Sequence, residues 1–288
     1  MIKHAQRFLV KTDNRMTKNP SDVLQMGAAA LARAIRAGEL NPVDVVEAHI
    51  QRIEAVNPYI NAVVTPMFAS AREQAQQASQ RLKTANVADL PPLFGVPVTI
   101  KDSWPIAGER LVGGSWHLRD NIATEDAPVV QRMKAAGAII LGKTNCPDMC
   151  WLAETDNPVF GRTNNPWDLE RSAGGSSGGE GAIIAAGGSP LGIGSDIAGS
   201  VRIPAATNGL VSLKPTGGRV PSAGHLPKPA DEIITWNTAG PMARRVEDLA
   251  LALDILSDTP TRDYAEISLQ GRRLIVYINN GIYPVRGP

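Results

Sequence analysis

The spacing of apolar residues predicts three helices in the first third of the chain. Ser21 is a suitable N-cap for a helix over residues 22–38, which would end at Gly38. A second helix over residues 43–57, opened by Asn41 and Pro42, carries an apolar stripe formed by Val46, Ile50 and Ile53. Residues 69–84 predict a more polar third helix. We expect the polar residues 1–20 to be poorly ordered and the folded domain to span residues 21–288.

A different pattern begins near residue 95, where short β-branched runs alternate with helical segments. Residues 95–100 and 138–142 predict buried strands, separated by a helix that begins at Pro128 and ends at Gly137. This strand–helix–strand order is typical of parallel pairs in an α/β sheet. Further along the chain the pattern predicts a buried helix over 180–187, an amphipathic helix over 244–256 and a strand over 273–278.

Composition excludes several classes of protein. The chain has 288 residues, of which 43% are hydrophobic, and a net charge of +1, so we expect a buried core and no general affinity for nucleic acid. The sequence contains no run of about 18 apolar residues, so we expect no membrane-spanning helix. We also expect a cytoplasmic protein. Cys146 and Cys150 are too few for a disulfide framework, and the scattered histidines do not complete a zinc site. We therefore expect no metal.

The segment "SAGGSSGGEG", residues 172–181, is the most distinctive stretch. It does not fit a phosphate-binding loop, because Glu180 stands where a lysine would close that loop. A dinucleotide fingerprint would follow a strand directly, whereas a polar loop precedes this segment. A flexible linker is also a poor fit, since an apolar run follows it.

A second glycine-rich stretch, "GIGSDIAGS", ends at Ser200. Small residues before a serine allow close approach to the backbone, and consecutive N–H groups in such a turn can point at one oxygen atom. This is the arrangement of an oxyanion hole. A serine nucleophile needs a base, and Lys101 directly follows the predicted strand over 95–100. The alternative for Lys101 is an ordinary lysine at a strand end, paired with Asp102.

Five segments then occur in one order, and together they resemble the amidase signature family of serine hydrolases over residues 25–280. They are "PLFGVPVTIKD", "GKTNCPD", "NPVFGRTNNPWD", "SAGGSSGGEGAIIAAGGSPLGIGSDIAGSVRIPA" and "GLVSLKPTGGRV". The resemblance implies a mixed central β-sheet flanked by helices in an α/β/α arrangement. It also implies a small-molecule amide as substrate and no cofactor. It is closer to the general amidase or fatty-acid-amide-hydrolase-like branches than to the amidotransferase A-type subunit.

The resemblance also assigns roles to individual residues. It implies a triad in which Ser200 is the nucleophile, Ser176 is a bridging serine that follows a cis peptide bond, and Lys101 is the general base. The family's oxyanion hole matches Ile197, Ala198, Gly199 and Ser200. Substrate contacts are expected from Cys150, Ser176 and Ser177, and Ser177 also matches a supporting serine. We expect Asp196 and Arg202 to orient the nucleophile loop.

The sequence departs from the family in two places. Ala198 stands where the family usually has glycine, which would strain the loop if that residue needs a positive φ. The chain is also short, so the sheet is expected to be incomplete at the C-terminus and to pair with a second copy or with a complementing C-terminal chain. A catalytically silent homologue that acts as an interaction module is the alternative to an active amidase.

Overall fold

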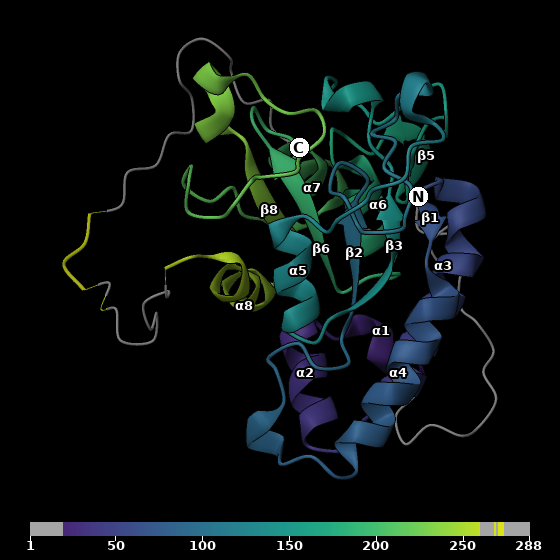
Figure 1. The fold of residues 1–288 in the computed structure, drawn as a ribbon, viewed down its shortest axis with the longest axis vertical. Helices are drawn as coiled ribbons and strands as arrows, with labels where there is room; N and C mark the ends of the chain where they lie inside the picture. The colour runs from purple at the N-terminus through teal and green to yellow at the C-terminus, as the bar shows by residue number, and fades with distance from the viewer. Residues whose placement is uncertain (1–19, 260–267, 269, 274–288) are drawn as a thin grey trace.

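The computed structural model describes residues 20–259, 268 and 270–273, and a mixed six-stranded sheet lies at its centre (Figure 1). The order across the sheet is β1 (Val63–Pro66), β3 (Ile139–Thr144), β2 (Pro97–Lys101), β6 (Leu191–Asp196), β8 (Thr238–Ala243) and β7 (Val211–Ser212). Strands β3, β2 and β6 run parallel to one another, whereas β1 is antiparallel to β3, and β8 is antiparallel to both β6 and β7. A separate antiparallel pair consists of β4 (Asn164–Asn165) and β5 (Asp168–Ser172).

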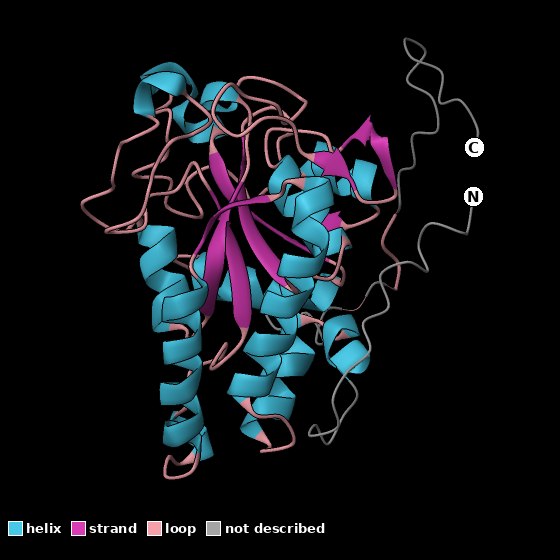
Figure 2. Ribbon diagram, turned by 90° about the vertical axis from the view of Figure 1, so that its right-hand side faces the viewer, coloured by secondary structure: helices cyan, strands magenta, loops and turns pink. Residues whose placement is uncertain are grey.

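Helices cover both faces of the sheet (Figure 2), which confirms the expected mixed α/β architecture. The α-helices are α1 (Pro20–Gln25), α2 (Ala28–Arg36), α3 (Pro42–Ile60), α4 (Phe68–Leu82), α5 (Pro128–Ala135), α6 (Gly178–Ala185), α7 (Arg202–Asn208) and α8 (Val246–Leu256). Short 3-10 helices are η2 (Val87–Asp89), η3 (Trp116–Leu118), η4 (Asp148–Cys150) and η5 (Asp231–Trp236). None of the helices in the described ranges is both long and apolar enough to cross a bilayer.

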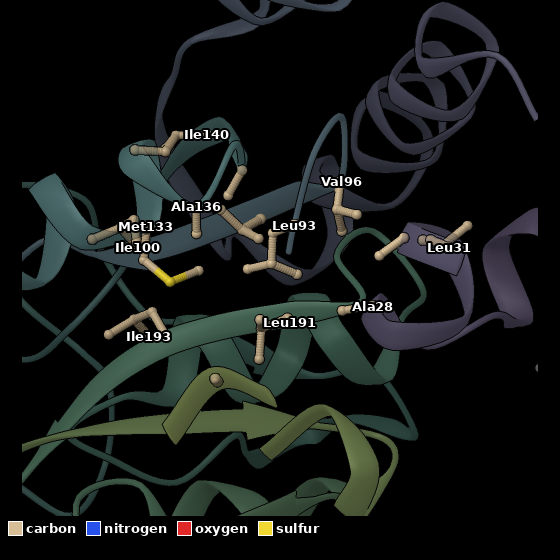
Figure 3. Close-up of a cluster of buried hydrophobic side chains, with 14 of the residues drawn as sticks. Ala28, Leu31, Leu93, Val96, Ile100, Met133, Ala136, Ile140, Leu191 and Ile193 are labelled. Atoms are coloured by element: carbon tan, nitrogen blue, oxygen red, sulfur yellow. The ribbon is translucent and has the colours of Figure 1, made fainter. Parts of the chain in front are cut away.

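Two hydrophobic clusters form the core, one on each face of the sheet. The first joins α2, α5 and α8 to apolar side chains of the inner strands, and Figure 3 shows Leu31, Met133, Ile100 and Ile193 within it. The second cluster joins α3, α4, α6 and α7 to the other face. Strand β3 contributes to both, because alternate side chains of a strand point to opposite faces. The clusters therefore hold the inner strands between two helical layers.

The same alternation along β2 determines the polar face of the site. Val98 and Ile100 belong to the first cluster, so Thr99 and Lys101 are directed toward α6 on the other face. All five residues of β2 are buried. The fold therefore introduces a hydroxyl and an amine into the interior beside the first turn of α6.

The prediction of one helix over residues 22–38 was wrong, because the structure has two helices with a break at Gly27. Side chains from the distant α8 region stabilise the break. Asp248 accepts a hydrogen bond from the N–H of Ala29, and Arg244 donates to two carbonyls at the end of α1. A Cβ on Gly27 would lie 2.5 Å from a carboxylate oxygen of Asp248, so a larger residue there would displace the carboxylate that holds the break.

The other predicted helices are confirmed, with small differences at their ends. The Asn41 side chain accepts a hydrogen bond from the N–H of Val43, so α3 begins with the expected cap and then runs to Ile60. The predicted strands near residues 95–100 and 138–142 correspond to β2 and β3. Of residues 1–20, predicted to be poorly ordered, Pro20 is the first residue of α1 and residues 1–19 lie outside the described residues. Most of the predicted strand over 273–278 lies outside them as well.

Candidate active site

Lys101 lies at the end of β2 with its side chain completely buried. Its Nζ donates to Ser176 Oγ over 2.6 Å and to Ser195 Oγ over 2.9 Å. The structure thus brings together two of the three triad residues expected from the sequence. Ser195 was not predicted, since nothing in the spacing of "GIGSD" distinguishes it from a serine of an ordinary strand.

The alternative partner of Lys101, Asp102, belongs to a different pair. Its Oδ1 lies 2.7 Å from Nζ of Lys143, with both side chains fully buried. Its Oδ2 accepts hydrogen bonds from the N–H groups of Val112 and Gly113. Lys143 also donates to the carbonyl of Arg110. The interpretation of Lys101 as a strand-end lysine paired with Asp102 is therefore wrong, and the Lys101 amine faces the two serines.

The segment that carries Ser176 fits tightly against its surroundings. The peptide bond between Gly175 and Ser176 is cis. A Cβ on Gly175 would lie 2.7 Å from the carbonyl oxygen of Leu152, so only glycine is accommodated there. Thr155 Oγ1 donates to the carbonyl of Gly174 and accepts from the N–H of Gly178, which ties both ends of the serine pair to one hydroxyl.

The backbone of Ser177 connects the pair Ser176–Ser177 to the loop that carries Ser200. Its N–H donates to the carbonyl of Ser200 over 3.0 Å, and its Oγ lies 3.3 Å from both the N–H and the carbonyl of Ser195. No hydrogen bond joins the hydroxyls of Ser176 and Ser200, both of which lie in the described part of the chain. Ser200 is half-buried, whereas Ser176 and Ser177 are buried. Lys101, Ser176, Ser177 and Ser200 thus form one cluster, and Ser200 is its most exposed member.

Asp196 fixes the loop that carries Ser200. Its carboxylate accepts hydrogen bonds from the N–H groups of Gly199 (2.7 Å) and Val201 (3.1 Å), and from the guanidinium of Arg202. Burial alone would raise the pKa of Asp196, but the bonds from Arg202, Val201 and Gly199 outweigh it and lower that pKa. The carboxylate therefore stays charged and fixes the turn.

The four residues expected to form the oxyanion hole differ in the availability of their N–H groups. The N–H of Gly199 is directed to Asp196. Those of Ile197, Ala198 and Ser200 have no acceptor within the part of the chain that the structure describes. Ala198 has no positive φ and is exposed, so the strain considered from sequence is absent. Gly199 has φ +124°, and it is the position at which the loop requires glycine.

Cys150 lies beside the amine and the bridging serine. Cys150 and the preceding Met149 both have positive φ. The Cys150 Sγ lies 3.8 Å from the carbonyl oxygen of Leu226. A hydrogen bond from the Cys146 thiol lowers the pKa of Cys150 to about 6, against burial and with further help from Lys101 and Ser176. Both cysteines are free thiols. The contact between Cys150 and substrate stays a prediction.

A histidine that sequence reasoning did not select also faces this site. His225 packs edge-to-face on Trp104 with ring centroids 4.7 Å apart, and its Nδ1 pairs with the carbonyl of Pro227. Burial and then the charge of Lys101 lower the pKa of His225 to about 3. The ring is therefore neutral near pH 7.

The two tryptophans near this segment differ in exposure. Trp104 is buried and its Nε1 donates a hydrogen bond to the carbonyl of Gly194, whereas the side chain of Trp116 is 54% exposed.

No group of three or more His, Cys, Asp or Glu side chains within the described ranges is arranged to hold a metal ion.

Comparison with known proteins connects this geometry to one family. The model of the family described as Amidase matches residues 44–272. The chain is 40% identical over 276 residues to fatty-acid amide hydrolase 2-A of Danio rerio, covering 93% of this chain and 52% of that protein. It is 42% identical over 243 residues to indoleacetamide hydrolase of Bradyrhizobium diazoefficiens, covering 84% of this chain and 46% of that protein.

A solved structure of a fatty acid amide hydrolase superposes with a TM-score of 0.80 at 30% identity. The alignment covers 86% of this chain and 46% of the other chain. The chain therefore spans about half the length of the curated relatives it matches.

Proposed function

The chain belongs to the amidase family, and we propose that it hydrolyses a small carboxylic amide to the acid and ammonia or an amine. The observation that carries the proposal is the 2.6 Å contact between the buried Lys101 Nζ and Ser176 Oγ, next to the loop that presents Ser200. A buried amine against a serine hydroxyl is an arrangement suited to proton transfer.

In the first half of the reaction, Ser200 attacks the carbonyl carbon of the amide. The unprotonated amine of Lys101 accepts the proton of Ser176, and Ser176 accepts that of Ser200 as the new C–O bond forms. Since the two serine hydroxyls are not bonded to each other in this structure, the transfer requires Ser200 to turn toward Ser176. The N–H groups of Ile197, Ala198 and Ser200 are available to the developing oxyanion.

In the second half, the C–N bond breaks and the acyl group remains on Ser200. The proton held by Lys101 returns through Ser176 to the departing nitrogen, which leaves as ammonia or an amine. Water then attacks the acyl-Ser200 ester and gives its proton to the same relay, which restores the serine and releases the acid. The overall reaction consumes one water and needs no redox cofactor.

The names of the relatives support an amide as the substrate class. They are hydrolases of fatty-acid amides and of indoleacetamide, which favours a general amidase over an amidotransferase subunit. Because the chain spans about half of those relatives, catalytic activity of this chain is part of the proposal, and the silent homologue is the competing outcome.

A fluorophosphonate probe tests the proposal, since it reacts only with an activated serine. We expect the probe to label the wild-type chain and Ser70→Ala, a control on α4 outside the site, but not Ser200→Ala. The labelled chain should also hydrolyse simple acyl amides. A folded wild-type chain that takes up no label would favour the silent homologue.

A further inference from the structure

Glu180 is completely buried in the first turn of α6, four residues after Ser176. Its two carboxyl oxygens accept hydrogen bonds from Thr99 Oγ1 on β2 (2.6 Å) and from Thr144 Oγ1 on β3 (2.9 Å). A buried carboxyl group held only by two hydroxyls is costly unless it has a role or a counter-charge.

The sheet makes room for this carboxyl group on the face that also carries Lys101. Thr99 is two residues before Lys101 on the same face of β2, and Thr144 is the register partner of Lys101 on β3. A Cβ on Gly192 of β6 would lie 1.9 Å from Glu180 Oε2, so the neighbouring strand must carry glycine there. Residues of three strands thus surround the carboxyl group, and one of those strands, β2, also carries Lys101.

Both threonines that bind Glu180 are neighbours of Lys101, one along β2 and one across to β3, so Lys101 is the basic side chain that this arrangement brings toward the carboxyl group. No arginine or lysine forms an ion pair with Glu180 among those residues. We propose that Glu180 is a positioning residue that controls the pH at which Lys101 releases its proton, and so sets the strength of the base in the serine relay. The inference rests on the proposed function for its catalytic consequence, although not for the interaction itself.

The electrostatics of the pocket support this role. Burial raises the pKa of Glu180 to about 8, against the hydrogen bonds from Thr99 and Thr144 and the charge of Lys101. Near neutral pH the carboxyl group is therefore largely protonated. Above about pH 8 it ionises, and a buried negative charge favours the charged form of an amine close to it. A base that binds its proton more firmly takes it more readily from Ser176.

Three other titratable groups lie close enough to Lys101 to feel its charge. They are Cys146 and Cys150 from the segment after β3, and His225 from the loop that packs over Trp104. These three groups are the same in the wild-type chain and in Glu180→Gln, so a difference between the two proteins reports Glu180. Glutamine has nearly the same shape as glutamate, and its amide cannot ionise, so the variant isolates the charge.

The experiment measures the titration of Lys101 directly and through catalysis. In chains labelled with 13C-lysine, the Lys101 Cε resonance is identified by its loss in Lys101→Met and followed by NMR against pH. We expect its midpoint in Glu180→Gln to lie about one unit below that of the wild type. The acid limb of kcat/KM should move by the same amount, and kcat on the plateau should fall several-fold. Glu247→Gln, an exposed glutamate on α8, is the matched control and should change neither.

The outcomes separate this inference from the proposed function. A shifted Lys101 resonance in a chain that neither hydrolyses amides nor takes up the probe supports the coupling and refutes the amidase. An active enzyme whose Lys101 midpoint and acid limb are the same in Glu180→Gln overturns the inference, since a purely structural role lowers kcat without moving the limb. If Glu180→Gln does not fold, Thr144→Val replaces it. That change removes one donor to the carboxylate, so the midpoint should move in the same direction by a smaller amount, and an unmoved midpoint overturns the inference.

Discussion

The backbone N–H of Gly199 is hydrogen bonded to Oδ1 of Asp196 over 2.7 Å. This bond takes one of the four N–H groups expected at the oxyanion hole and uses it to hold the turn that presents Ser200. The carboxylate therefore organises the loop, and the N–H groups of Ile197, Ala198 and Ser200 are left for a ligand oxygen. If the turn binds an oxyanion as proposed, positioning and binding are divided between neighbouring residues of it.

Asp196→Asn should disrupt this turn. The amide accepts through one oxygen only, so it cannot receive Gly199, Val201 and Arg202 as the carboxylate does. We expect the free energy of unfolding to fall by about 1–3 kcal/mol and kcat by about 100-fold. Urea unfolding and amide hydrolysis measure the two effects. Asp254→Asn, at an exposed position of α8, is the control, and an Asp196→Asn enzyme with unchanged kcat would contradict the assigned role.

Gly199→Ala and Ala198→Gly should have very different effects. Gly199 has φ +124°, and a Cβ there would lie 2.9 Å from Ile203 Cδ1, so alanine is strained and crowded. We expect Gly199→Ala to lower the free energy of unfolding by about 1–3 kcal/mol. Ala198→Gly should cost less than about 1 kcal/mol, because Ala198 is exposed and has no positive φ. Equal losses in thermal unfolding experiments would show that this description of the turn is wrong.

Lys101 and Lys143 are both fully buried, and we expect replacement of the first to reduce activity and replacement of the second to reduce stability. Lys101→Met tests the effect on activity. Methionine has a similar length and leaves no charge in the interior, so the fold should persist with little change in Tm. Without the amine, Ser176 has no base, and kcat should fall by at least about 100-fold. Steady-state kinetics and calorimetry on one preparation measure both. A variant that retains most of the wild-type kcat would remove Lys101 from the mechanism.

Lys143→Met is the structural half of the comparison. It leaves Asp102 buried without its cation, so we expect a loss of about 3–5 kcal/mol in the free energy of unfolding. Lys134→Met removes an exposed pair with Asp126 and should cost less than about 1 kcal/mol. The double variant Asp102→Asn/Lys143→Met should recover part of the loss. The prediction fails if the single and control variants are equally stable in urea.

Much of the site could be predicted from local sequence because its parts are determined by their immediate neighbours. The β-branched run before Lys101 indicates a buried strand, and the glycines around Ser176 indicate a backbone closely packed on all sides. The Asn41–Pro42 pair marks the start of α3 in the same local way. Each of these features depends on residues only a few positions apart.

The missed elements depend on contacts between distant segments. Strand β6 carries glycine at 192 and 194 because Glu180 and Ser177 occupy the space of their side chains, so it lacks the pattern of a strand. The break between α1 and α2 depends on Asp248, 219 positions from Ala29. His225 reaches the site only through the fold of its loop against Trp104.

The stability of the protein should also report the buried histidine of α3. His49 is completely buried with Nδ1 on the carbonyl of Val45, and burial lowers its pKa from 6.5 to about 4. Between about pH 4 and pH 6.5, His49 is therefore protonated in the unfolded chain but neutral in the folded chain. Its contribution to stability falls by about 1.4 kcal/mol per pH unit from pH 6.5 to about pH 4, and is constant above that window.

His49→Leu removes this contribution while other groups, including His225 and Glu180, titrate equally in both proteins. The difference in free energy of unfolding between the two proteins should therefore be constant above pH 7. Below pH 6.5 it should shift in favour of the variant by about 1.4 kcal/mol per unit. Urea unfolding at pH 5, 6, 7 and 8 measures it. A difference independent of pH would mean that His49 is protonated to the same extent in the folded and unfolded chains, contrary to its burial.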